Sequence, residues 1–150
     1  MAQNQTLLTP AARLVGGSLY QGQTTDAQGA PLIVKTGPNK GQPREDFYFG
    51  VAIPKGTEQH WAHTDWGRSI HGVGAAAFPH ASQMPTFSWK ITDGDSTVPT
   101  SAKGARPCDR EGYPGHWVLH FSSGYAPRVY NKDGSQQIVE PGMVKTGYWV

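Results

Sequence analysis

Aromatic rings and cations that share one face of a strand are the side chains in this sequence with the clearest chemical use. They stand out in the segment 115–132, where Arg128, Tyr130 and Lys132 alternate with other residues. Successive side chains of a strand point to opposite faces, so these three share an open surface. Cations can follow the phosphates of a flexible polyanion while flat rings stack on its bases. The same residues would also suit an exposed sheet edge, where the cations act only as solubilising groups.

Further rings and cations are expected on the same kind of surface in other segments. Tyr48 is predicted to point away from the core in the strand 47–53, and Lys90 does the same in the strand 86–92. The other members lie in loops or on a short strand: Lys35, Arg44, Lys103, Arg106 and Tyr113. Base stacking contributes about 1–3 kcal/mol per base, so two or three rings would give useful affinity. Together with the three residues above, this set is the predicted nucleic-acid-binding surface.

Two histidines close in sequence could form part of a metal site. His60 and His63 are three residues apart on a predicted helix and could share a face, with Asp65 nearby. A zinc site needs three or four ligands with supporting hydrogen bonds, and the remaining ligands would have to come from elsewhere. We therefore expect surface histidines here, and no metal or other cofactor.

Four carboxylates offer another route to catalysis, as the magnesium ligands of a small nuclease. They are Asp93, Asp95, Asp109 and Glu111. All four lie in or beside the loop 93–115, and turns often contain aspartate for backbone reasons alone. Cys108 has no histidine paired with it and is expected to be an unreactive thiol. We expect no catalytic residue and no enzymatic activity, with a metal-dependent nuclease as the alternative.

Composition favours a single β-rich domain. The chain has 150 residues with 19 glycines and 12 prolines, and so many turn formers indicate short strands.

A net charge of +2 is too small to indicate nucleic-acid binding, so the local arrangement of the cations must carry that prediction. One cysteine allows no intramolecular disulfide, which fits a reducing cytoplasm. We expect neither a signal peptide nor a membrane span, since no long apolar run occurs.

Alternation of apolar and polar residues locates the main strands. The clearest are 47–53, 86–92 and the first half of 115–132, each with its odd-numbered apolar residues facing the core. A first strand is expected over 12–21, with a bulge or bend at its two glycines. A further short strand is expected over 31–36. Short strands separated by turns predict an all-β or β-rich fold, and the bend expected in the first strand is one that small barrels need at their corners.

The remaining segments predict one helix and several irregular pieces. The helix is expected to begin at Thr57, as its cap, and to end near Ile70. Residues 1–11 look like a flexible lead-in. The pair Asp133-Gly134 predicts a hairpin turn. The closing GYWV, at 147–150, predicts the beginning of a last strand, and we expect the chain to have been shortened after it.

The order of these segments resembles that of a family of bacteriophage single-stranded DNA-binding proteins with an OB fold. The resemblance covers about residues 14–150. Its most specific parts are the IPK before the helix, a strand with Trp117 that leads to Pro-Arg-Val at 127–129, and the closing Gly-Tyr-Trp. It implies a single domain over 1–150, built as a five-stranded Greek-key barrel with one helix and long loops.

The resemblance also implies a function. Such proteins coat and protect single-stranded DNA, largely independently of sequence, during phage DNA replication, recombination or repair in the cytoplasm of the infected bacterial host. An acidic C-terminal tail commonly recruits phage or host replication proteins. The last carboxylate here is Glu140, so either such a tail has been removed or this protein departs from the family pattern, in which case the recruitment of partners is not implied. The other non-enzymatic alternative is a structural or protein-binding β domain of a virion.

Overall fold

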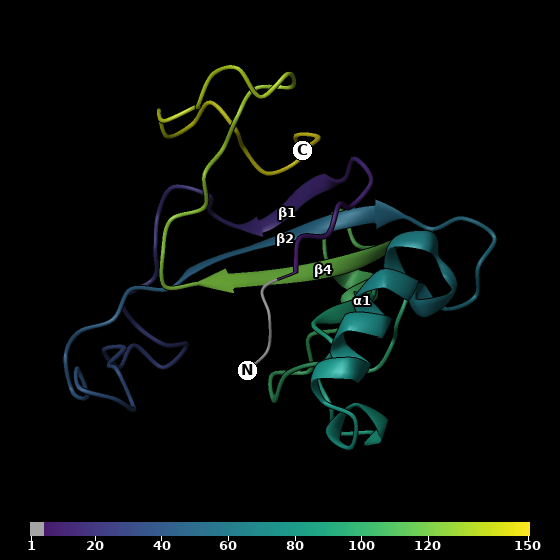
Figure 1. Cartoon of the computed structure of the whole chain (residues 1–150), viewed down its shortest axis with the longest axis horizontal. Helices are drawn as coiled ribbons and strands as arrows, with labels where there is room; N and C mark the ends of the chain where they lie inside the picture. The colour runs from purple at the N-terminus through teal and green to yellow at the C-terminus, as the bar shows by residue number, and fades with distance from the viewer. Residues whose placement is uncertain (1–4) are drawn as a thin grey trace.

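Four antiparallel strands form an open sheet within residues 5–150, the part of the chain that this computed structural model describes (Figure 1). The strands are β1 (Arg13–Gly17), β2 (Phe47–Pro54), β3 (Ile91–Asp93) and β4 (His116–Ser123). Their order across the sheet is β1-β2-β4-β3, so β2 and β4 are the central pair. A single α-helix among the described residues, α1 (Asp65–Ala77), packs beside the sheet. The prediction of a mainly β fold with one helix is confirmed.

The sheet buries an apolar surface next to α1, which we call the helix face. Across β2 and β4, Val51 pairs with Leu119 and Ile53 pairs with Trp117, and all four are at most 5% exposed. Ile70 of α1 packs against this cluster. Burying each such side chain contributes about 1.5–3 kcal/mol. The prediction of a core face from the odd-numbered apolar residues is confirmed for these four residues and is wrong for Phe121, which is 38% exposed near the end of β4.

The opposite face of the sheet, which we call the loop face, is also buried over part of its area. Ala52 and Val118 are 0% exposed there, and Val15 packs beside them. Tyr113, from the loop between β3 and β4, completes this small cluster and is 5% exposed. The prediction of an open second face is therefore wrong where Tyr113 covers it.

Two glycines bend β1 as expected. The pairing register between β1 and β2 shifts between Val15 and Gly17. Gly17 has a φ of +73°, which favours glycine, and a Cβ there would overlap the carbonyl oxygen of Tyr48. The predicted bulge is confirmed, although β1 is shorter than the predicted 12–21.

α1 begins later than predicted because Thr64 rather than Thr57 caps it. The Thr64 hydroxyl accepts a hydrogen bond from the Gly67 backbone N at 2.9 Å and donates one to the Trp61 carbonyl at 2.7 Å. The second bond joins the short 3₁₀ helix η1 (Trp61–His63) to the start of α1. A Cβ at Gly67 would overlap the Trp61 carbonyl oxygen, so this junction requires glycine.

Only the end of the predicted strand 86–92 pairs with the sheet, as β3. Lys90 has a φ of +59° and is the non-glycine residue with a positive φ in the described chain. This left-handed conformation bends the chain and separates β3 from the residues before it. Trp89 instead packs against α1, where Gly74 leaves space for its ring. The strand prediction is therefore wrong for 86–90.

The C-terminal segment runs along the outer edge of β1 (Figure 1). Ala12 and Val150 exchange two backbone hydrogen bonds, of 2.9 and 2.7 Å. The Leu14 backbone N also donates to the Tyr148 carbonyl at 2.8 Å. Residues 147–150 thus pair with β1 through an isolated bridge at Arg13 and Trp149 and through these backbone bonds, and they form no strand of their own where a last strand was predicted.

The shorter predicted pieces have mixed outcomes. Tyr130 bridges to Gln137, which confirms the hairpin turn at Asp133-Gly134. The segment 31–36 makes only isolated bridges instead of a strand. Of the predicted flexible lead-in, residues 1–4 lie outside the described residues, and the residues from 5 to 10 have no regular secondary structure. Across the described chain, no helix combines the length and apolar character needed to cross a membrane.

Candidate nucleic-acid interface

Aromatic rings and a lysine line a hollow of about 470 Å³ at the β3 edge of the sheet, which we call the ring hollow. Its walls include Tyr48, Trp61, Phe87, Trp89, Lys90, Thr92 and His120. β2 and β4 supply the tyrosine and the histidine, and the bent segment before β3 supplies most of the others. Two residues of the predicted binding set, Tyr48 and Lys90, therefore meet here.

His120 connects β4 to the strands on both sides of it. Its Nδ1 lies 2.7 Å from the Tyr48 hydroxyl, and its Nε2 lies 2.8 Å from the Thr92 hydroxyl. The Tyr48 and His120 rings also stack, with their centroids 6.1 Å apart. These contacts fix the orientation of both rings before any ligand arrives. Little side-chain entropy is then lost when a ligand packs against them.

Lys90 holds its backbone in a conformation that lysine rarely adopts. Its carbonyl accepts a hydrogen bond from the His120 backbone N at 2.9 Å, so the bend is tied to β4. A non-glycine residue in the left-handed region costs about 1–3 kcal/mol and persists only where its surroundings enforce it, often at functional sites. Lys90 is exposed and lines the ring hollow, so the bend places a cation beside the rings.

Trp89 is a wall residue that the sequence pattern assigned to the core. Its ring is half-buried, stacks on His71 with centroids 4.9 Å apart, and meets Phe87 edge-on at 4.8 Å. The Trp61 ring lies 5.4 Å from it. The density of rings at 87–89 was the available signal, and the predicted continuous strand concealed it.

Two cations, Arg110 and Lys90, act electrostatically on His120. Burial lowers the pKa of the His120 imidazole, and the charges of Arg110 and Lys90 lower it further. Burial also raises the pKa of the Tyr48 hydroxyl. Arg110 lies over the Tyr113 ring, 5.5 Å from its centroid. Arg110 was not in the predicted set, although its neighbour Arg106 was. An anionic group next to His120 would find two cations within electrostatic reach.

The predicted face of Arg128, Tyr130 and Lys132 lines a separate hollow of about 820 Å³, which we call the C-terminal hollow. Tyr148 and Trp149 line it as well and are 49% and 56% exposed. These two rings come from the segment that extends the sheet beyond β1. The sequence pattern identified the first three residues but gave no reason to place the closing rings beside them.

Other cations of the predicted set lie outside both hollows. Lys35 and Arg44 belong to the loop between β1 and β2, which extends from the sheet on the side away from α1 (Figure 1). Arg44 forms an ion pair with Asp46. Lys103 is exposed in the loop between β3 and β4. The structure therefore does not gather all the predicted cations on one surface.

Two further members of the predicted set are already engaged by the protein. Arg106 binds both carboxylate oxygens of Asp109, at 2.7 and 3.0 Å. Tyr113 is buried against Val15 and Val118, so its ring is not available to stack on a base. This burial removes Tyr113 from the candidate interface, because a ring that completes a core cluster cannot also contact a ligand.

Two of the candidate magnesium ligands bind a lysine instead. The Lys55 Nζ donates to the carboxylates of Asp93 and Asp95, the latter at 2.7 Å, and lies 4.3 Å from the Trp117 ring centroid. The hydrogen bonds from Lys55 and from the Gly115 backbone N lower the pKa of Asp95. Within residues 5–150, no group of three or more His, Cys, Asp and Glu side chains comes together in a way that could hold a metal ion.

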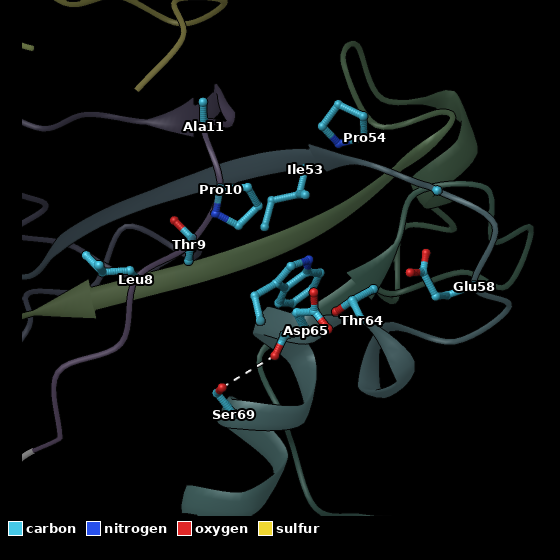
Figure 2. Close-up of a pocket in the computed structure, with 12 residues that line it drawn as sticks. Leu8, Thr9, Pro10, Ala11, Ile53, Pro54, Glu58, Thr64, Asp65 and Ser69 are labelled. Carbon is cyan, nitrogen blue, oxygen red and sulfur yellow. Dashed lines mark hydrogen bonds between the residues drawn. The ribbon is translucent and has the colours of Figure 1, made fainter.

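A further hollow, of about 620 Å³, lies between the N-terminal segment, the end of β2 and the start of α1 (Figure 2). Leu8, Pro10 and Ile53 contribute apolar wall, while Glu58 and Asp65 contribute carboxylates. Among its described lining residues there is no lysine or arginine. A polyanion would be repelled there, so the ring hollow is the stronger candidate for nucleic acid.

Comparison of this chain with protein-family models, with curated proteins and with solved structures finds no match. The functional argument therefore depends on the residues of the chain itself.

Proposed function

We propose that this protein binds single-stranded DNA, largely independently of sequence, and that it is not an enzyme. The observation that carries the proposal is the backbone of Lys90, bent into the left-handed region beside the rings of the ring hollow. A lysine that only solubilises a surface needs no such strain. Strain of this kind is found where a side chain must be held in place for function.

The ring hollow offers the two kinds of contact that a bare strand needs. Trp89 and Tyr48 line the hollow, with His71 and His120 stacked on one side of each ring. A base could stack on the other side of either ring, because every base has a π surface. Lys90 and Arg110 supply charge for the neighbouring phosphates, and phosphate contacts carry no sequence information. Bases paired in a duplex are stacked on each other and do not offer these faces. Single strands should therefore bind more tightly than duplex DNA.

The finer fold and the biological role belong to the same proposal. We assign the sheet to a partly open OB-type Greek-key barrel of five strands, with 147–150 as the fifth at the β1 edge; the backbone bonds between this segment and β1 support the fifth strand. The role that follows from the sequence resemblance is to coat and protect single strands during phage DNA replication, recombination or repair. The site of action would be the cytoplasm of the infected bacterium, with phage or host replication proteins as partners.

The experiment that tests the proposal is a titration of fluorescein-labelled oligo-dT with wild-type protein and with Lys90→Gly, read by fluorescence anisotropy. Glycine adopts a positive φ without strain, so this variant should be more resistant to urea than wild type. It also lacks the cation, so its affinity for oligo-dT should fall several-fold. Lys40→Ala, an exposed lysine in the loop between β1 and β2, is the matched control and should bind as wild type does.

Opposite changes in stability and affinity separate a binding role of Lys90 from a structural one. If Lys90→Gly binds oligo-dT as tightly as wild type does, the observation on which the proposal depends has no bearing on function. If wild-type protein fails to bind oligo-dT, the proposal itself is wrong.

A further inference from the structure

We propose that the C-terminal hollow is a second base-binding site for the same single strand, so that one strand bound in the ring hollow at the β3 edge also reaches residues 147–150 at the β1 edge of the sheet. This inference rests on the proposed function. It adds a separate site at the opposite edge of the sheet and predicts how affinity depends on strand length.

Rings of the C-terminal hollow remain accessible in the folded protein. Tyr130, Tyr148 and Trp149 are 47%, 49% and 56% exposed. Residues that serve only the core of a small domain are buried far more completely, as Val51 and Leu119 are in this sheet. Three half-exposed rings around one hollow can stack on bases, since each keeps a large part of its surface in contact with solvent.

The charge of the C-terminal hollow suits a polyanion. Arg128 and Lys132 are exposed and line it, and none of its described lining residues is acidic. Arg13 adds a third cation, placed over the Trp149 ring at 5.5 Å from its centroid. The hollow beside the start of α1, by contrast, has carboxylates on its wall. An apolar peptide would need none of these cations, so we favour a nucleotide strand as the occupant.

A row of rings connects the two hollows. The ring hollow shares Trp89, Lys90 and His120 with a smaller hollow of about 360 Å³, which extends to Phe121. The Phe121 ring stacks on the Phe49 ring of β2, with centroids 5.1 Å apart and planes inclined by 15°. Phe49 in turn lines the C-terminal hollow. Gln5, Leu7 and Thr9 of the N-terminal segment and Ile70 of α1 also line the smaller hollow. Tyr48 and His120 lie at alternate positions to Phe49 and Phe121 along β2 and β4, so the strand would turn around the β3 edge at Lys90 before it reaches these two rings.

The width of the sheet sets the length of strand that reaches both sites. From β3 through β4, β2 and β1 to residues 147–150 there are four inter-strand spacings of about 4.8 Å, or about 19 Å in total. Stacked nucleotides advance about 3.4 Å each along one strand, so about six nucleotides span this distance. An oligonucleotide of about four nucleotides can occupy only one hollow, whereas one of about twelve can occupy both.

The test measures affinity for oligo-dT of about four and about twelve nucleotides with wild type, Trp149→Ala and Trp89→Ala. Loss of one stacked base corresponds to roughly a 5- to 150-fold change in Kd. Trp149→Ala should weaken binding of the longer oligonucleotide by this factor and reduce the gain in affinity that length confers. Trp89→Ala should weaken binding at both lengths. Tyr125→Ala, which removes a ring that is 84% exposed and lies outside both hollows, is the control and should change neither.

A second variant guards against a local folding defect at the C-terminal edge. Trp149→Tyr keeps a ring in the hollow and should restore most of the affinity lost by Trp149→Ala. If the longer oligonucleotide binds normally to both Trp149→Ala and Tyr130→Ala, the second site is wrong while the proposed function stands. If no variant and no wild-type protein binds either length, the proposed function fails instead. Displacement of an apolar dye from this hollow by an apolar peptide but not by the longer oligo-dT would also overturn the assignment.

Discussion

Replacing Gly74 by alanine should displace the ring of Trp89 from the ring hollow. A methyl group on Gly74 would lie 3.0 Å from Cη2 of the Trp89 ring and would overlap its Cζ3 atom. Gly72, in the same helix, has no atom within 4 Å of the position that its Cβ would take. Gly72→Ala is therefore a control with the same chemical change on the same element and no contact with the ring.

The expected magnitudes follow from two opposing effects. Alanine in the interior of a helix is favoured over glycine by about 0.8–1.0 kcal/mol, so Gly72→Ala should raise the free energy of unfolding by about that amount. Gly74→Ala has the same helix gain, but forcing extra volume into a packed contact costs about 1–3 kcal/mol. Trp89 is half-buried and can move, so the cost should lie at the lower end of that range. The two variants should differ by about 1–2 kcal/mol.

Urea unfolding followed by tryptophan fluorescence measures the first quantity, and titration with oligo-dT measures the second. We expect Gly72→Ala to be stabilised with unchanged affinity, and Gly74→Ala to bind several-fold more weakly because the displaced ring no longer presents its face. Equal stabilisation of both variants, with wild-type affinity in each, would refute the packing of Trp89 over Gly74 and the role given to that ring.

Three further predictions concern the elements that hold the site. Thr64→Ala removes the cap of α1 and should lower the free energy of unfolding by about 1 kcal/mol in urea denaturation, whereas Thr57→Ala should have little effect. Lys55→Met leaves the carboxylates of its ion pairs without a partner and should destabilise the protein at neutral pH. The pKa of Asp95 is held below its ordinary 3.8, so the stabilisation from this ion pair should be present above pH 3.8 and be lost as the pH falls through the lowered pKa. Acid titration of the wild-type and Lys55→Met proteins would show this difference. The pKa of the His120 imidazole is lowered from 6.5 in the folded protein, so the imidazole binds a proton more readily in the unfolded state. The free energy of unfolding should therefore fall as the pH drops below 6.5. This decline should be smaller in His120→Gln, which has no imidazole to protonate.

Patterns that depend on burial of a whole strand face were predictable from the sequence. The alternation in β2 and β4 required one apolar side, and Val51, Ile53 and Leu119 are buried on that side as expected. The paired glycines of β1 likewise predicted a bend, because only glycine accepts a positive φ without strain. In each case one physical requirement acts on neighbouring residues of a single segment, so the segment itself contains the signal.

Features decided by competition between distant residues were not predictable. Thr57 and Thr64 are both good helix caps by residue type, and the choice depends on the bond from Thr64 to the Trp61 carbonyl. The predicted strand breaks at Lys90, whose carbonyl accepts a hydrogen bond from His120, thirty residues later in the chain. The sequence of 86–92 alone favours a continuous strand.

In the candidate site, too, some residues were predictable from the pattern of one segment, and others depend on contacts between distant segments. Strand alternation identified Tyr48 and Lys90, which lie together in the ring hollow. It also placed Tyr113 on the binding surface, although the loop between β3 and β4 folds back and buries that ring. Arg110 and His120 were missed because their relevance comes from their distance to Tyr48 and Lys90, and spacing along the chain does not reveal that distance.

The central claim is that exposed rings and nearby cations bind a bare nucleotide strand, and the most direct measurement is quenching of tryptophan fluorescence by oligo-dT over a range of salt concentrations. Trp89 and Trp149 line the two hollows, so stacking bases should quench the emission. Each phosphate neutralised on a single strand contributes about −0.7 to the slope of the logarithm of the binding constant against the logarithm of the salt concentration. Contact with Lys90, Arg110 and the cations of the C-terminal hollow therefore predicts a slope of about −2 or steeper. Saturable quenching with that slope is the expected result. Fluorescence unchanged by oligo-dT, or an affinity that does not vary with salt, would contradict the account.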